Sequence, residues 1–153
     1  MSASGLQSER ITLQAVCLGW LGRGLLLRGP PGTGKSDLAL RLLEAGADLV
    51  ADDLVALERR DERLIARPVA YPGLVEARGQ GLFRLASLPN RALDLLVDCR
   101  ARTATRLPAP RRETILGVAL PVLALACRDA SAPARLRLAL LAEPFGGALE
   151  GSR

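Results

Sequence analysis

A glycine-rich segment that ends in lysine and serine is the part of this sequence that points most directly to chemistry. Its residues are Gly29, Pro30, Pro31, Gly32, Thr33, Gly34, Lys35 and Ser36. They fit the pattern G-x-x-x-x-G-K-[ST], in which glycines let backbone N–H groups curl around phosphate oxygens without side-chain clashes. The lysine of this pattern bridges the terminal phosphates of ATP, and the last hydroxyl holds Mg²⁺. The segment therefore predicts a P-loop that binds ATP and Mg²⁺ and serves phosphoryl transfer.

The use of basic residues favours this interpretation over the alternative, a purely structural glycine turn. Lys35 is the only lysine among the 21 basic residues of the chain, and all the others are arginines. A compact ammonium on a flexible stem can reach between phosphate oxygens, whereas the guanidinium of arginine is planar and rigid. We therefore expect Lys35 to contact phosphate.

Two adjacent carboxylates, Asp52 and Asp53, follow the run 48–51, which favours a short buried strand. Side chains alternate across a strand, so only one of the two carboxylates is expected to face the phosphates. Near Mg²⁺ and Lys35 that carboxylate stays ionised and can accept the proton of an attacking hydroxyl. A turn with two solvated aspartates explains the residues equally well, and the pattern alone leaves both interpretations open.

A carboxylate, a guanidinium and two glycines share the segment 76–81, which contains Glu76, Arg78 and Gly79. Such a mixture suits a second contact to metal and phosphate. Taken alone, however, the segment favours the alternative, which is an exposed turn with an ion pair.

The absence of histidine from the sequence excludes several kinds of catalysis. Ser-His-Asp and Cys-His mechanisms, histidine phosphorylation and His-containing zinc sites all need that side chain. A GTPase is not expected either, because its Asn-Lys-x-Asp motif needs a second lysine. Although the net charge is +5, aromatic residues make up only 3% and the arginines are dispersed, so nucleic-acid binding is not expected.

Three cysteines, Cys17, Cys99 and Cys127, lie far apart, each in an apolar run. This spacing predicts three small buried thiols rather than a disulfide framework or a metal site. No apolar run approaches the length of a membrane span, and the N-terminal residues do not resemble a signal peptide. We therefore expect no membrane contact and a cytoplasmic protein.

The apolar periodicity predicts one α/β domain with a mixed β-sheet over residues 1–153, with a core at about residues 10–143. Strands are expected at residues 11–18, 25–28, 48–51, 54–57, 64–67, 93–99 and 118–127, and turns at 22–24 and 58–63. Helices are expected at residues 36–44 and 133–143. The remaining expectations are an ordered loop at 71–80, a surface linker at 100–112 and a frayed end at 145–153.

Three motifs together resemble the HPr kinase/phosphorylases, specifically the compact form that consists of the catalytic domain alone. They are the P-loop continued by Asp37-Leu38-Ala39-Leu40, the segment Val50-Ala51-Asp52-Asp53, and the segment Glu76-Ala77-Arg78-Gly79-Gln80-Gly81. Further matching segments are Arg106-Leu107, Leu116-Gly117-Val118 and Leu120-Pro121, so the similarity covers roughly residues 12–141. The combination is far more specific than any one motif.

The resemblance implies an α/β fold in which a P-loop-containing mixed β-sheet is flanked by helices, like that of HPr kinase and phosphoenolpyruvate (PEP) carboxykinase. It also implies an ATP-dependent kinase that phosphorylates a serine of the phosphocarrier protein HPr and thereby regulates the phosphotransferase system. Full-length members reverse this reaction with inorganic phosphate. Family analogy further suggests a homo-oligomer, namely a hexamer.

The resemblance also implies a role for each matching position. These roles are general base for Asp53, magnesium ligands for Ser36 and Glu76, catalytic arginine for Arg106, phosphate contact for Lys35, and nucleotide contacts for Arg78 and Gly79. Gln14 stands where the family usually carries a histidine that assists the aspartate, and glutamine cannot titrate. Transfer through Asp53 and magnesium can persist, because positioning and electrostatics supply most of the catalysis of phosphoryl transfer.

Two further departures concern the reverse reaction and the loop at 76–81. The family's C-terminal Gly-Arg is missing, since Pro121-Val122 leads only to Cys127-Arg128-Asp129, and Gln80 replaces an apolar residue. The resemblance therefore predicts the kinase reaction and leaves the phosphorylase reaction in doubt.

Two other functions remain as alternatives. The residue sequence of the loop is also common in AAA-type ATPases. These proteins need an apolar strand that ends in Asp-Glu, whereas here Asp98 is followed by Cys99. The other alternative is a nucleotide-binding regulatory protein that has lost transfer together with the histidine and acts through contacts alone. ATP binding without a phosphorylated product would favour it.

Overall fold

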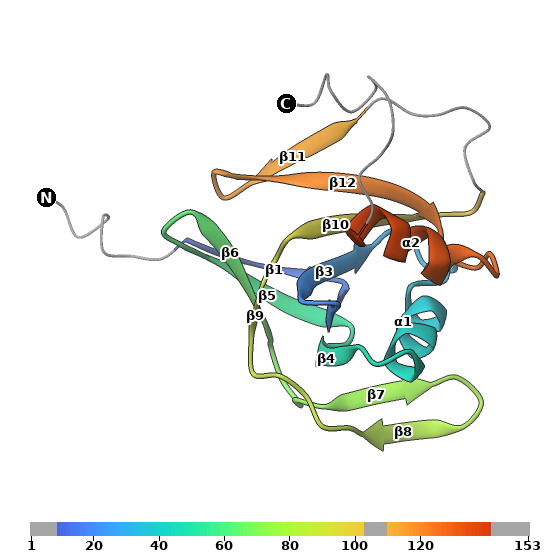
Figure 1. Ribbon diagram of the computed structural model, residues 1–153. Coiled ribbons are helices and arrows are strands. Elements are labelled where there is room, and N and C mark those ends of the chain that lie inside the picture. The colour runs from blue at the N-terminus through green and yellow to red at the C-terminus, as the bar shows by residue number, and fades with distance from the viewer. Residues whose placement is uncertain (1–8, 103–109, 142–153) are drawn as a thin grey trace, which may run out of the picture.

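The computed structural model describes residues 9–102 and 110–141, which form a large β-sheet, a smaller sheet, a β-hairpin and two helices (Figure 1). From edge to edge, the large sheet contains β11 (Arg111–Ile115), β12 (Val118–Ala126), β10 (Leu95–Arg100), β3 (Arg23–Arg28), β2 (Val16–Trp20) and β4 (Asp48–Ala51). Strands β12, β10 and β3 are parallel, whereas β11, β2 and β4 pair antiparallel with their neighbours. The large sheet is therefore mixed, as expected.

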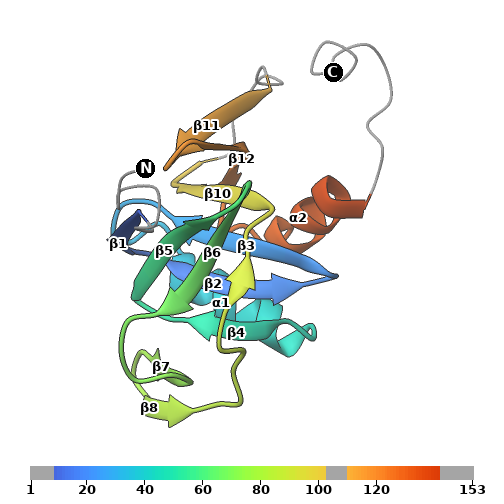
Figure 2. The same ribbon diagram turned by 90° about the vertical axis from the view of Figure 1, so that its left-hand side faces the viewer.

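The smaller sheet and the helices cover opposite faces of the large sheet (Figures 1 and 2). The smaller sheet contains β1 (Arg10–Gln14), β5 (Leu54–Arg60), β6 (Arg63–Pro68) and β9 (Arg91–Ala92). The helices are α1 (Lys35–Glu44) and α2 (Ala132–Leu141), and the hairpin consists of β7 (Leu74–Ala77) and β8 (Gly81–Arg84). The domain thus has three layers, in the order helices, large sheet, small sheet.

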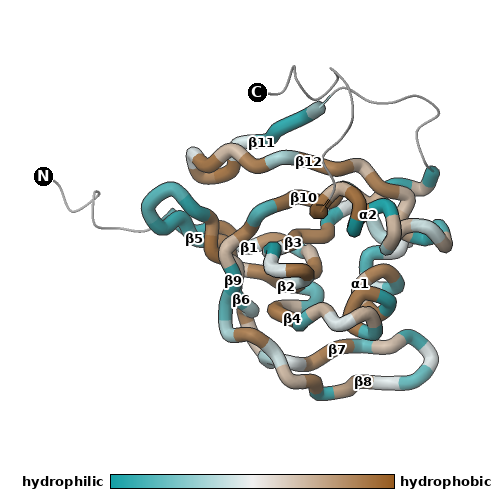
Figure 3. The backbone as a smooth tube through the Cα atoms, viewed as in Figure 1, coloured by the Kyte–Doolittle hydropathy of each residue, from teal (hydrophilic) through white to brown (hydrophobic). Residues whose placement is uncertain are grey.

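Strand β3 shows how the sequence builds these layers. Its Leu25 and Leu27 pack in the cluster that includes Leu38 of α1, whereas Leu26 packs in the cluster that includes Leu57 of β5. All five side chains are fully buried, and each burial stabilises the fold by about 1.5–3 kcal/mol. Figure 3 shows the apolar residues along these strands and the hydrophilic turn between β5 and β6. A strand that is apolar on both faces therefore lies in the centre of the sheet, directly before the glycine-rich segment.

The single strand expected at residues 11–18 is instead two strands, because the chain passes from one sheet to the other at Ala15. The backbone N–H of Ala15 donates to the carbonyl of Asp53 at 2.9 Å rather than to a strand partner. The next turn lies one residue earlier than expected. Leu21 and Gly22 have φ values of 53° and 76°, as a two-residue hairpin turn with the twist of its strands requires.

The loop expected at residues 71–80 was wrong in part, since β7 and β8 form a hairpin there. Val75 and Ala77 are buried and Glu76 between them is exposed, which is the alternation of a strand with one face on the core. The glycines that favoured a loop flank this short strand, as Gly73 and Gly79 have φ values of 80° and 83°. The charged turn expected at 58–63 contains only residues 61–62, because β5 and β6 stay paired as far as Arg60 and Arg63.

The other expected elements agree more closely with the structure. The helix expected at residues 36–44 is α1, the strand at 48–51 is β4, and the strands at 93–99 and 118–127 are β10 and β12. The helix expected at 133–143 is α2, which begins one residue earlier. The expected linker at 100–112 runs into β11 at Arg111, while residues 103–109 and the end from residue 142 lie outside the described residues.

The expectation of three buried thiols was wrong, because Cys99 and Cys127 form a disulfide with their Cα atoms 5.4 Å apart. Cys99 lies in β10 and Cys127 directly follows β12. These parallel strands are neighbours, so their carboxyl ends lie side by side although the two cysteines are 28 residues apart in the sequence. Cys17 alone is free and buried, and this burial, opposed only by the charge of Arg91, raises the pKa of its thiol to about 12. Within the described residues, no helix is long and apolar enough to cross a membrane.

Candidate functional site

The glycine-rich segment forms the loop between the end of β3 and the start of α1, as the sequence predicts. Gly29, Gly32 and Gly34 have φ values of 145°, 84° and 98°, which residues with a side chain adopt only with strain. A Cβ at Gly29 would also lie 2.7 Å from the carbonyl oxygen of Cys99. The loop conformation therefore requires these glycines.

The start of α1 is open to an anion. Gly34 is the N-cap, and the cap has no side-chain hydrogen bond. The first N–H groups of a helix need an acceptor and carry a partial positive charge. Here they meet no side-chain cap, so phosphate oxygens fit as their acceptors.

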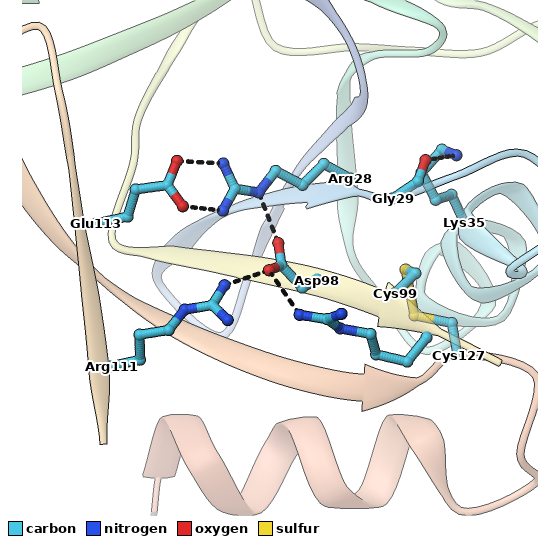
Figure 4. Close-up of polar contacts among 9 residues, drawn as sticks. Arg28, Gly29, Lys35, Asp98, Cys99, Arg111, Glu113 and Cys127 are labelled. Atoms are coloured by element: carbon cyan, nitrogen blue, oxygen red, sulfur yellow. Dashed lines mark hydrogen bonds and ion pairs between the residues drawn. A yellow bond between two sulfur atoms is a disulfide. The ribbon is translucent and has the colours of Figure 1, made fainter. Parts of the chain in front are cut away.

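Lys35 lies back over its own loop. Its Nζ donates to the carbonyl oxygen of Gly29 at 2.6 Å (Figure 4) and to that of Pro30 at 3.3 Å. Thr33 Oγ1 donates to the carbonyl oxygen of Pro30 at 2.7 Å. The ammonium group thus contacts neutral carbonyls, which a phosphate oxygen would replace with a charged acceptor. The loop, its lysine and the uncapped helix together fit the phosphates of a nucleotide.

The two aspartates lie at the end of β4, on the same edge of the molecule. Cys17 of β2 pairs with both Leu26 of β3 and Ala51 of β4, so the ends of β3 and β4 lie on either side of β2. Asp53 follows with a φ of 81°, a strained conformation for a residue other than glycine. Such a conformation occurs in turns as well as at functional sites, so the role of Asp53 stays a prediction.

The carboxylates of Asp52 and Asp53 differ in their surroundings, but both residues follow the last residue of β4, so strand alternation does not apply to them. Asp52 is half-buried and accepts a hydrogen bond from the backbone N–H of Glu76 at 3.4 Å. Burial raises the pKa of Asp52, the charges of Asp53 and Glu76 add to this, and the hydrogen bond opposes it. Asp53 is exposed. Asp52 therefore links β4 to β7, and Asp53 is the carboxylate that a substrate can reach.

Gln14 and Glu76 also lie on this edge. Gln14 is exposed at the end of β1 and lines an open pocket of about 410 Å³ together with Gly29 and Pro30 of the loop. Glu76 lies on β7, where its backbone contacts Asp52. The structure thus gathers Gln14, the glycine-rich loop, the two aspartates and Glu76 from four separate stretches of sequence.

The oxygen-bearing side chains of the edge suit a magnesium ion. In the part of the chain that the structure describes, no three His, Cys, Asp or Glu side chains cluster as a metal site. Mg²⁺ does not need such a cluster, because it usually binds one or two carboxylates together with phosphates and water. The hydroxyl of Ser36 and the carboxylates of Asp53 and Glu76 are donors of this type.

Three predicted site residues lie in the turn of the hairpin or outside the described residues. Arg78 and Gly79 lie in the exposed turn between β7 and β8. Arg106 lies outside the described residues. Their roles in binding and catalysis stay predictions.

A charged cluster beside the loop escaped the sequence analysis. Arg28, the last residue of β3, donates through Nε to Asp98 Oδ1 at 2.6 Å and through both terminal nitrogens to Glu113, with Nη1 2.7 Å from Oε2 (Figure 4). Arg100 and Arg111 donate to the other oxygen of Asp98. This arginine–carboxylate cluster ties β3, β10 and β11 together next to Gly29. Nothing in the sequence indicates this cluster beyond the charged residues within or at the end of each strand.

The cluster changes the titration of its carboxylates. The hydrogen bonds from Arg28 lower the pKa of Glu113. Burial by itself raises the pKa of Asp98, but the hydrogen bonds and charges of Arg28 and Arg111 outweigh it and the pKa is lowered. Both carboxylates are therefore ionised at neutral pH, and the pKa of Arg28 is raised in turn, chiefly by Glu113.

Comparison with known proteins connects this edge to one family. The family model described as HPr Serine kinase C-terminal domain matches residues 6–88, more than half of the 153-residue chain. The HPr kinase/phosphorylase of Acidovorax sp. (strain JS42) is 35% identical over 131 residues, or 76% of this chain and 41% of the relative. That of Azoarcus sp. (strain BH72) is 31% identical over 129 residues, or 74% of this chain and 41% of the relative. The chain thus spans less than half the length of these curated relatives.

A solved structure shows the same fold. The HPr(Ser) kinase/phosphatase from Coxiella burnetii superposes with a TM-score of 0.72 and covers 85% of this chain and 93% of that chain, at 24% sequence identity. The expected fold class, an α/β domain with a mixed sheet and helices of this type, is thereby confirmed. One face of the large sheet is covered by the smaller sheet, where the expected fold had helices.

Proposed function

The chain belongs to the family of HPr serine kinase C-terminal domains, and on that premise we propose that it is an ATP- and Mg²⁺-dependent kinase of a serine in HPr. The proposal includes an action in the cytoplasm, a role in regulating the phosphotransferase system and carbon metabolism, and assembly into a homo-oligomer, by family analogy a hexamer. The observation that carries it is the uncapped start of α1 behind a glycine loop that bears the only lysine of the chain.

Binding is the task of the loop residues. The N–H groups at the start of α1 donate to phosphate oxygens. The ammonium of Lys35 also donates to phosphate oxygens, in place of the carbonyls of Gly29 and Pro30. When bound, ATP would supply the phosphoryl group and Mg²⁺ would neutralise the negative charge that develops on it. Ser36 and Glu76 are the proposed magnesium ligands.

Asp53 is the proposed general base. Asp53 is exposed after the end of β4, and the hydrogen bond from the N–H of Glu76 engages Asp52 instead. The carboxylate of Asp53 would accept the proton of the attacking serine hydroxyl and orient that hydroxyl. Gln14 can donate or accept a hydrogen bond at the same edge but cannot share the proton. We therefore limit the proposal to the forward kinase reaction.

The test is to incubate the protein with ATP, Mg²⁺ and purified HPr and to search HPr for phosphoserine by mass spectrometry. Phosphoserine that depends on Mg²⁺ supports the proposal. Absence of product despite measurable ATP binding would reject it and favour the regulatory protein, which the replacement of a titratable residue by Gln14 makes the second candidate.

A further inference from the structure

The segment 127–129, directly after β12, is held against the glycine-rich loop. Cys127 is bonded to Cys99 at the end of β10. Arg41 of α1 donates to the carbonyl oxygens of Cys127 and Asp129, the latter at 2.9 Å, and the N–H of Asp129 donates to Ala126 at 3.0 Å. The segment is thus fixed both to the large sheet and to α1.

This fixation places Arg128 on the loop. Its Nε donates to the carbonyl oxygen of Gly32 at 3.0 Å. Its stem lies so close to Gly34 that a Cβ there would come within 2.6 Å of Arg128 Cγ and 3.2 Å of its backbone nitrogen. Two of the loop glycines therefore lie in contact with one arginine from a distant part of the sequence.

The guanidinium of Arg128 has further N–H donors besides the one that donates to Gly32. Arg128 is exposed, and within residues 9–102 and 110–141 the bond to Gly32 is the one hydrogen bond or ion pair recorded for its side chain. A guanidinium has five N–H donors, and its planar fork binds phosphate oxygens in pairs. A carbonyl on the loop is a weaker acceptor than a charged phosphate oxygen.

We propose that Arg128 is a further phosphate-binding residue of this site, in which its guanidinium binds oxygens of the terminal phosphates of the nucleotide alongside Lys35. The inference rests on the proposed function, because it presupposes a nucleotide in the loop. It also gives the segment 127–129 a role here, although the Gly-Arg expected from the family resemblance is missing.

Titration calorimetry of the whole chain with MgATP and MgADP tests the inference. Arg128→Ala weakens MgATP binding by about tenfold or more, the loss expected for one charged hydrogen-bond donor. Arg128→Lys keeps the charge and recovers part of this affinity. Arg128→Gln can still donate to Gly32 but has no charge, so this variant does not recover the affinity for MgATP. The matched control is Arg137→Ala, which removes the same charge from an exposed position of α2 and leaves the affinity unchanged.

The outcomes distinguish a failure of the proposed function from a failure of the inference about Arg128. If the unaltered chain binds neither nucleotide, the proposed function and the inference both fail. If it binds them and Arg128→Gln binds equally well, Arg128 only fixes the loop and the inference alone is overturned. Thermal melting by circular dichroism identifies a variant that has lost its fold, and the lysine and glutamine variants then still compare charge with hydrogen bonding.

Discussion

The arginine–carboxylate cluster adjoins the glycine-rich loop at Gly29, yet the two depend on different ranges of the sequence. In the loop, Lys35 Nζ contacts a carbonyl six positions away, and Thr33 contacts one three positions away. In the cluster, Arg28 contacts carboxylates 70 and 85 positions away. The proposed chemistry therefore comes from a local motif, while the strands that hold this motif are joined by distant pairs.

Substitutions in the loop and in the cluster should therefore have different effects. Changes at the loop edge should alter binding or transfer and leave folding nearly intact, because the groups there are exposed. Changes in the cluster, or in the neighbouring disulfide, should alter the free energy of unfolding first. The predictions below test this separation.

The largest effect is expected for Asp53→Asn, which removes the proposed base but keeps the size of the side chain. Phosphoryl transfer to HPr should slow by about 10²- to 10⁴-fold, the usual contribution of general base catalysis. Affinity for MgATP should be retained, which calorimetry can establish beside a kinetic assay. Asp52→Asn is the control, because the carboxylate of Asp52 is engaged with the N–H of Glu76. Equal rates for Asp53→Asn and the unaltered chain would remove Asp53 from the mechanism.

An intermediate effect is expected for loss of the Cys99–Cys127 disulfide. Cys127→Ser should lower the free energy of unfolding by about 2–4 kcal/mol, as typical for a cross-link that closes a loop. Urea unfolding with and without dithiothreitol measures it. The reductant should destabilise the unaltered chain and have no effect on Cys127→Ser. A reductant effect of equal size in both would show that the bond does not carry this stability.

The smallest effect concerns pH and the arginine–carboxylate cluster. The pKa values of Asp98 and Glu113 are lower in the folded chain than their ordinary values of about 3.9 and about 4.3. Their contribution to stability is therefore complete above about pH 5 and is lost as the pH falls through the folded values. The raised pKa of Asp52 acts in the opposite sense, since protonation relieves a buried charge.

Comparison with Arg28→Met isolates the contribution of the cluster to this pH dependence. The free energy of unfolding should fall less steeply between about pH 5 and pH 3 in this variant than in the unaltered chain, because the two carboxylates lose Arg28, the arginine that donates to both of them, while Asp98 keeps Arg111. The effect of Asp52 is common to both chains and cancels. Parallel curves would show that Arg28 does not set the acid sensitivity.

The sequence was informative for much of the local structure, though not for the hairpin β7–β8. The loop 29–36, helix α1 and strand β4 follow from glycine spacing and apolar periodicity, and all three were placed correctly. The split at Ala15 could not be predicted, because a change of sheet leaves an apolar run uninterrupted. The hairpin β7–β8 was hidden by glycines that flank its strands.

The missed contacts all depend on strand order. The disulfide exists because β10 and β12 are neighbours, and Arg128 contacts Gly32 because β12 ends beside the loop. Periodicity in the sequence does not specify which strands pair. Apolar periodicity predicted the α/β class with a mixed sheet, and the family resemblance supplied the proposed role of Asp53, which the residues alone left open.

The central claim is that the loop captures the phosphates of a nucleotide through Lys35. Calorimetry with MgATP should detect binding to the unaltered chain and a loss of at least about tenfold in Lys35→Ala, the weakening expected when one charged donor is removed. Circular dichroism should show that this variant keeps its fold, because Lys35 contacts only exposed or half-buried loop carbonyls. Equal affinity in the two proteins, or no binding to the unaltered chain, would contradict the account.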